Sequence, residues 1–233
     1  MSFEQKVKPL TNTKFDKMVS IGVRCIPATT MVNTRLKQET FTFDWIQSNP
    51  QIILDCIKDG FKKYNNFGQE KVSDKYDMHI RYEPFYNTEF PKRLINEYGM
   101  CFTHYTEYDY EKFRDMCKRR SERFMNLLSS DNSILFVYMN DKQVELQKKQ
   151  YKYLLNLEQY LIDTYPDLNF KILALHDISE TDTKRIINLK TVRKNGIFIE
   201  GKHFGKSYDP SMVKCFQAIF KTHKKYPQQK LFQ

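Results

Sequence analysis

The sequence has little glycine and proline, with 7 and 8 residues among 233. These low contents exclude collagen-like chains and linkers, in which both residues are abundant. No apolar run approaches the roughly 18 residues of a membrane-spanning helix, and the polar beginning, MSFEQKVKPLTNTKFDK, lacks the core of a signal peptide. Because apolar residues make up 40% of the chain, we predict a soluble globular protein of the cytoplasm.

Several ligand-binding motifs are also missing. The 5 cysteines form no CxxC pair, so a zinc ribbon is not indicated. Neither GxGxxG nor GxxxxGK followed by Ser or Thr occurs, which gives no support to a dinucleotide or P-loop phosphate site. No acidic metal motif stands out. We therefore predict no particular cofactor, and dependence on a divalent metal stays open.

Positive charge is concentrated toward the C-terminus. The formal net charge is +10, and residues 202–233 hold seven lysines against a single acid, Asp209. Such an excess suits nucleic acid or an anionic substrate, and it is equally typical of a solubilising tail. Lysines without a recognised motif predict only non-specific, salt-sensitive binding of nucleic acid. This is the third function that we consider.

Hydrophobic patterning divides the chain into a flexible arm, residues 1–17, and a single α/β domain, residues 18–233. Residues 64–98 have weak periodicity and are expected to form a loop-rich insertion. The predicted strands are 18–22, 100–104, 133–139, 170–175 and 196–200. The predicted helices are 28–37, 51–63, 110–128, 141–164 and 209–222.

The succession of strand, long helix and strand over residues 133–175 predicts a βαβ unit. Short, fully apolar strands are typical of a parallel sheet that is buried on both faces. The expected class is therefore a three-layer, Rossmann-like α/β fold with a mostly parallel sheet. Ligands of such sheets bind beyond the carboxyl ends of the strands. The candidates at those ends are Arg24, Cys25, His104, Asn140, Asp141, His176, Asp177, Lys202 and His203.

Most of these residues also fit a structural role. Asn140 and Asp141 open a predicted helix, where both residue types are good caps. Asp177 fits a cap or a turn in the same way. His104 and His176 fit as hydrogen-bonded residues at the end of a strand. The two interpretations stay open for each.

Cys25 follows a turn at Gly22 and precedes a predicted helix that has Pro27 in its first turn. A thiol at this place is close to a helix N-terminus and to Arg24, and both lower the pKa of a cysteine. Cys25 is therefore a candidate nucleophile. The alternative is an inert cysteine.

The helix predicted over residues 110–128 carries Arg120 in the middle of its apolar face, with Arg123 toward one side. A buried arginine is costly unless an anion pairs with it. One interpretation is an internal ion pair with Asp44 or Asp74. The other is a guanidinium that binds phosphate or carboxylate.

The only tryptophan, Trp45, ends the segment Phe41-Thr-Phe-Asp44-Trp45. The segment fits a core anchor in which Asp44 turns inward to pair with an arginine. It equally fits a platform on which a base or a sugar stacks. Both interpretations stay open.

Six short motifs follow one another along the chain. They are VSIGVRC at 19–25, FDW at 43–45, DKY at 74–76, CFTH at 101–104, RRSERF at 119–124 and ILFVY at 134–138. Their order resembles an uncharacterised family of bacteria and large DNA viruses that is labelled papain-like cysteine peptidases. The resemblance covers residues 18–180.

The resemblance implies that Cys25 is the nucleophile and His104 the base, and that the substrate is a peptide. Family members often have an acid directly after this histidine, where the present chain has Tyr105. The resemblance therefore leaves Asp177 or Asp109 for the third catalytic role. A viral origin would place the protein in the host cytoplasm.

The α/β pattern favours another class, because a papain-like fold packs a long helix on an antiparallel sheet. We predict first a glycosyltransferase that takes a nucleotide sugar and a glycan acceptor. Positive groups would stabilise the charge that develops on the leaving phosphate. Its substrate-binding residues would be Arg24, Trp45, Arg120, Arg123, Asn140 and His176, with Tyr138 as a second stacking ring, and Asp44, Asp74 or Asp177 as the base. A thiol hydrolase with Cys25 and His104 is the alternative.

Overall fold

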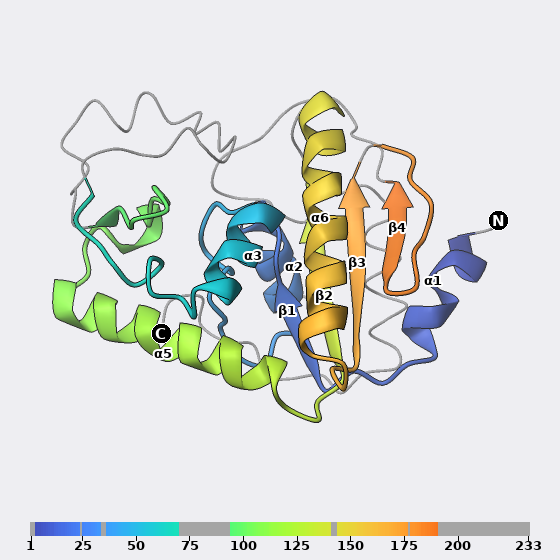
Figure 1. Ribbon diagram of the computed structural model, residues 1–233, viewed down its shortest axis with the longest axis horizontal. Coiled ribbons are helices and arrows are strands. Elements are labelled where there is room, and N and C mark those ends of the chain that lie inside the picture. Colours follow the sequence, from blue (N-terminus) through green and yellow to red (C-terminus); the bar gives the residue numbers. More distant parts are fainter. Residues whose placement is uncertain are drawn as a thin grey trace.

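The computed structural model describes residues 3–23, 25–33, 36–69, 94–140, 144–176 and 178–190 (Figure 1). Four strands form one sheet in the order β1-β2-β3-β4, and each pair of neighbours is parallel. The strands are β1 (Lys17–Ser20), β2 (Ile134–Met139), β3 (Phe170–His176) and β4 (Ile186–Lys190). The predicted α/β class with a parallel sheet is confirmed.

Helices cover both faces of this sheet (Figure 1). They are α1 (Phe3–Thr11), α2 (Ile26–Asn33), α3 (Pro50–Lys58), α5 (Tyr110–Leu128) and α6 (Val144–Thr164), with the short 3₁₀ helix η3 (Thr103–Tyr105). Side chains alternate between the two faces of a strand. Leu135 and Val137 therefore pack with Leu10 of α1, whereas Ile134 and Phe136 pack with α3, α5 and α6.

Helix α6 connects β2 to β3, and in Figure 1 it runs alongside these two strands. Its buried residues include Tyr151, Leu154, Leu157 and Leu161, whose spacing of three or four residues makes one apolar stripe. The same helix packs against α3. This unit is the βαβ arrangement predicted for residues 133–175.

Strands β3 and β4 are also parallel, yet the described part of their connection, residues 178–185, contains no helix. Helix α6 holds this connection instead. The buried Glu158 accepts hydrogen bonds from the hydroxyl of Thr183 and from the backbone N–H of Arg185, the latter at 3.0 Å. The hydroxyl of Tyr151 donates to the carbonyl of Thr181 at 3.3 Å.

Two predicted segments differ from the structure, and one strand of the structure was not predicted. Residues 3–11, expected within a flexible arm, form α1, because Val7 and Leu10 are buried against the sheet. The predicted strand at 100–104 is wrong: Cys101 makes an isolated bridge to Ile95, and the chain then turns into η3. Strand β4 was not predicted. The remaining predicted elements, 196–200 and 209–222, lie outside the described residues, as do the lysine-rich segment and residues 70–93 of the expected insertion.

Candidate functional site

The carboxyl edge of the sheet is where the chain places Cys25. Beyond the end of β1, the N–H of Ile21 donates to the carbonyl of Val137 at 3.0 Å, and the N–H of Val23 donates to Met139 at 3.1 Å. The first strand therefore continues beside β2 almost to Cys25. The thiol lies just past the point where these two neighbouring strands end.

The turn before Cys25 is held from two sides. The hydroxyl of Ser48 donates to the carbonyl of Gly22 at 2.8 Å. The N–H of Ser48 donates to the carbonyl of Val23 at 3.3 Å. A Cβ atom at Gly22 would lie only 2.6 Å from Cγ of Pro27. Glycine is needed here because the turn and the first turn of α2 are in close contact.

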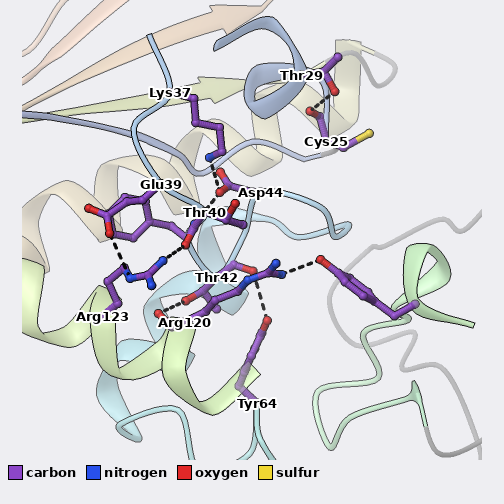
Figure 2. A network of polar contacts seen from close by, with 12 residues as sticks. Cys25, Thr29, Lys37, Glu39, Thr40, Thr42, Asp44, Tyr64, Arg120 and Arg123 are labelled. Carbon is purple, nitrogen blue, oxygen red and sulfur yellow. Dashed lines mark hydrogen bonds and ion pairs between the residues drawn. The ribbon is translucent and has the colours of Figure 1, made fainter. Parts of the chain in front are cut away.

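Cys25 itself stands at the start of α2. Its carbonyl accepts the N–H of Thr29 at 2.9 Å and the Thr29 hydroxyl at 3.1 Å, which makes the first turn of the helix. Its thiol is half-buried, whereas the other described cysteines are buried. In Figure 2 the sulfur points away from the ion pair of Lys37 and Asp44. Among the described cysteines, Cys25 has the most accessible thiol.

Lys37 and Asp44 form a buried ion pair, with side chains that are 1% and 0% exposed (Figure 2). The same carboxylate oxygen, Oδ2, accepts the N–H of Phe41 at 2.5 Å. Burial lowers the pKa of Lys37, and Asp44 opposes this shift. The adjoining Trp45 is 6% exposed. The core interpretation of this segment therefore holds, with Lys37 in place of the arginine expected to pair with Asp44.

Arg120 is held by Tyr105 rather than by a carboxylate. Its Nη1 donates to the Tyr105 hydroxyl at 2.6 Å, and its guanidinium lies 5.6 Å from the centre of the tyrosine ring. Burial alone would lower the pKa of Arg120, but Tyr105 and Asp44 outweigh it and raise that pKa. Burial raises the pKa of Tyr105 to about 12. The carbonyl of Arg120 accepts the Thr42 hydroxyl at 3.0 Å.

Arg123 is engaged as well. Its Nε lies 3.1 Å from Oε2 of Glu39, and its Nη1 donates to the carbonyl of Thr40 at 2.6 Å (Figure 2). Glu39 also pairs with Lys17 at 2.6 Å. Arg123 therefore ties α5 to the segment after α2.

Two other candidates at the carboxyl edge are buried. Asn140, 2% exposed, donates from Nδ2 to the Tyr138 hydroxyl and to Oε1 of Gln150, both at 2.8 Å. His176, 1% exposed, has its ring nitrogens 2.8 Å from the Ile178 carbonyl and 2.9 Å from Oδ1 of Asn188. No ring nitrogen of His176 is left for a substrate.

His104 lies in η3, directly before the buried Tyr105. Its side chain is exposed, yet the protein atoms around part of the ring lower its pKa by desolvation. Asp109 caps α5, where its Oδ1 accepts the N–H of Lys112 at 3.0 Å. The candidates Arg24, Asp74, Asp141, Asp177, Lys202 and His203 lie outside the described residues.

The sequence did not predict two residues that hold this region in place, Ser48 and Lys37. Ser48 bonds the turn that bears Cys25, and its only signal was the helix start of Asn49 and Pro50 that follows. Lys37 had no signal at all, because a lysine next to polar residues normally lies in solvent. Within the described residues, no three His, Cys, Asp or Glu side chains gather as a metal site. No described helix has the length and apolarity to span a membrane.

Fold and site together define an α/β protein with a half-buried thiol at the carboxyl edge of a parallel sheet. A family model described as "Putative papain-like cysteine peptidase (DUF1796)" matches residues 16–178, and the chain belongs to this family. It is also 27% identical over 174 residues to an uncharacterised protein of Acanthamoeba polyphaga mimivirus, an alignment that covers 69% of this chain and 78% of that protein. No solved structure gives a significant match.

The comparisons confirm the family resemblance seen in the sequence. They favour the thiol hydrolase over the glycosyltransferase that was predicted first. The family description suggests a hydrolase, and nothing in the comparisons supports a glycosyltransferase. The architecture differs from the antiparallel sheet and long helix expected of a papain-like enzyme, because the sheet is parallel and α2 has only 8 residues.

Proposed function

We propose that this protein is a cysteine-dependent hydrolase of amide or peptide bonds, with Cys25 as its nucleophile. The observation that supports this most is the position of Cys25. Its half-buried thiol stands at the start of α2, beyond the carboxyl edge of the sheet, and inside the region that matches the peptidase family.

The surroundings of Cys25 suit a reactive thiol. The partial positive charge at the N-terminus of a helix stabilises a thiolate, which is the nucleophilic form of cysteine. The bonds from Ser48 and the close contact of Gly22 with Pro27 fix the turn that carries the thiol. A fixed nucleophile loses little entropy when the substrate is attacked.

In the proposed reaction, the thiolate of Cys25 attacks the carbonyl carbon of the substrate. The C–N bond breaks, and the imidazolium of His104 gives its proton to the leaving amine. Water then hydrolyses the thioester, and His104 takes the proton of that water as a general base. Each proton is accounted for by His104 and water, so the cycle needs no further reactant.

The proposal gives His104 its role through the family resemblance and through its exposed position in η3. Asp109 and Asp177 remain the alternatives for an acid that orients the imidazole. Asp109 already caps α5 through Oδ1. Asp44 is set aside for this role because Lys37 and the N–H of Phe41 engage its carboxylate.

The test is hydrolysis of a pooled library of fluorogenic peptides by the full chain. We expect Cys25→Ala to abolish turnover and His104→Gln to reduce it strongly. Cys56→Ala is the matched control, because Cys56 is a buried cysteine on α3, an element that the proposal gives no catalytic role. Turnover that survives in Cys25→Ala would reject the proposal.

A further inference from the structure

Strand β4 is the last in the order of the sheet, and within the described residues no strand pairs with its outer side. A parallel strand bonds one neighbour through alternate residues. The N–H of Ile172 on β3 donates to the carbonyl of Arg185 at 2.9 Å. Because Arg185 faces β3, Ile186 and Asn188 direct their backbone groups to the outer side.

These outward groups are bonded by the chain that has just left β3. The N–H of Ile186 donates to the hydroxyl oxygen of Thr183 at 2.8 Å, and its carbonyl accepts the N–H of Thr183 at 3.0 Å. The N–H of Asn188 donates to Oδ1 of Asp182 at 2.7 Å. In Figure 1 this connection runs along the outer side of β4 before it enters the strand. Residues 181–183, which we name the edge guard, therefore fill bonding positions that a further strand would use.

The hydroxyl of Thr183 is oriented by its partners. The backbone N–H groups of Arg185, at 3.2 Å, and of Ile186, at 2.8 Å, both point at its oxygen. Since these groups only donate, the single hydroxyl proton goes to the carboxylate of Glu158. Helix α6 thus sets the oxygen of Thr183 as an acceptor for β4.

The rest of the edge guard is held from both faces of the sheet. The carbonyl of Thr181 accepts Nδ2 of Asn188 at 2.8 Å and the hydroxyl of Tyr151 on α6 at 3.3 Å. On the other face, Nζ of Lys6 on α1 lies 3.9 Å from Oδ1 of Asp182, in a partly exposed pair that adds little energy. The guard is therefore fixed by helices as well as by β4.

The side chains of β4 do not protect its outer edge. Exposed edge strands pair with other chains, and proteins block this pairing with charges, prolines or bulges. Residues 186–189 contain neither a charge nor a proline, and each is at most 5% exposed. Only Lys190, at the end of the strand, is charged. Protection of this strand therefore has to act on its backbone groups.

We propose that the edge guard keeps β4 from pairing with β4 of a second copy of this chain. A two-fold axis presents the same backbone groups in antiparallel order, so the outer edges of two β4 strands match each other. The inference does not depend on the role of Cys25, because β1, whose continuation leads to Cys25, lies at the other end of the sheet order.

The test opens the guard with little change of shape. Thr183→Val keeps a branched side chain without the hydroxyl, and Asp182→Ala removes the carboxylate. In sedimentation velocity of the full chain, we expect the double variant to form dimers as its concentration rises, with a mass approaching about twice that of the wild type. The matched control, Asp182→Asn with Thr183→Ser, keeps an acceptor oxygen at both positions and should sediment as the wild type does.

Amide hydrogen exchange shows whether β4 is the surface that pairs. In the wild type, we expect protection of the Ile186 and Asn188 amides to lie within about tenfold of that of Ile187 and Leu189, which face β3. In the double variant, the first two amides should lose this protection at low concentration. They should regain it in the dimer.

A folded double variant that sediments like the wild type would overturn the proposal. Dimers in which Ile186 and Asn188 stay unprotected would do the same, because they associate through another surface. Fast exchange of both amides in the wild type would contradict the bonds of the edge guard themselves. If the double variant does not fold, Thr183→Val is compared with Thr183→Ser in the same two measurements, with the same outcomes decisive for Ile186.

Discussion

The guanidinium of Arg120 donates a hydrogen bond to the hydroxyl of Tyr105 at 2.6 Å and lies over its ring. This contact joins the middle of α5 to η3. Since Tyr105 directly follows His104, the same contact fixes the backbone that carries the proposed base. An arginine that looked suited to a phosphate therefore has a structural partner.

Removal of that hydroxyl is the first prediction. Tyr105→Phe leaves the half-buried guanidinium of Arg120 without its acceptor, and we expect a loss of about 1–3 kcal/mol in the free energy of unfolding. Urea denaturation measures this loss. Tyr153→Phe is the control, because Tyr153 is a partly exposed tyrosine on α6. Equal stability of Tyr105→Phe and the control would show that the bond contributes nothing.

Gly22 gives a prediction about the turn that bears the thiol. A Cβ atom there would lie 2.6 Å from Cγ of Pro27, so Gly22→Ala should destabilise the protein by about 1–3 kcal/mol, as overpacking does. Pro27→Ala removes the clashing ring. We expect the double variant to be more stable than the sum of the single effects predicts, in a thermodynamic cycle. Strict additivity would argue against the close contact.

Asp16 gives a prediction for acid conditions. The backbone N–H and then the hydroxyl of Ser133 lower the pKa of Asp16 below its ordinary value of 3.8. A carboxyl with a lowered folded-state pKa stabilises the protein above the unfolded-state value, and this stabilisation is lost as pH falls through the folded-state value.

The matching experiment compares wild type with Asp16→Asn by urea denaturation at about pH 3 and pH 6, on either side of the ordinary pKa of an aspartate. We expect the wild type to lose more stability on acidification than the variant. The difference should be small because Asp16 is exposed. Identical losses would show that the bonds from Ser133 do not favour the charged form.

The sheet and its long helices were predictable because their patterns are local. The apolar run at 133–139 and the stripe of α6 are readable from spacing alone, and both elements appear within a few residues of the expected bounds. Helix α1 escaped because its sequence, FEQKVKPLT, is polar and contains Pro9. Only the tertiary burial of Val7 and Leu10 explains its presence.

The predictions for β4 and for the segment around η3 were wrong for opposite reasons. In IINLK, Asn188 interrupts the apolar run, and its burial makes sense only through contacts with His176, Tyr151 and Thr181. In MCFTH the apolar run suggested a strand, but Phe102 packs against the rings of Tyr64 and of Phe113 on α5. Short apolar runs do not distinguish the two cases.

The sequence predicted which polar residues lie at the carboxyl edge of the sheet, but not which partners they bind. The rule for parallel sheets places Cys25, Asn140 and His176 at one edge, which the parallel strands confirm. The partners of Asn140, His176 and Arg120 come from residues distant in sequence or of unexpected type, such as Tyr105. Spacing carries no information about such contacts, so it could not separate buried polar groups from exposed ones.

The most direct measurement of the central claim is the pH dependence of alkylation of Cys25 by iodoacetamide, followed by peptide mass spectrometry. If Cys25 is an activated nucleophile, its rate should stay high below about pH 7, where an ordinary thiol with a pKa of about 8.5 is protonated. His104→Gln should lower that rate at acidic pH, whereas Lys112→Gln, an exposed change on α5, should not. A rate for Cys25 that follows an ordinary thiol and ignores His104→Gln would contradict the account.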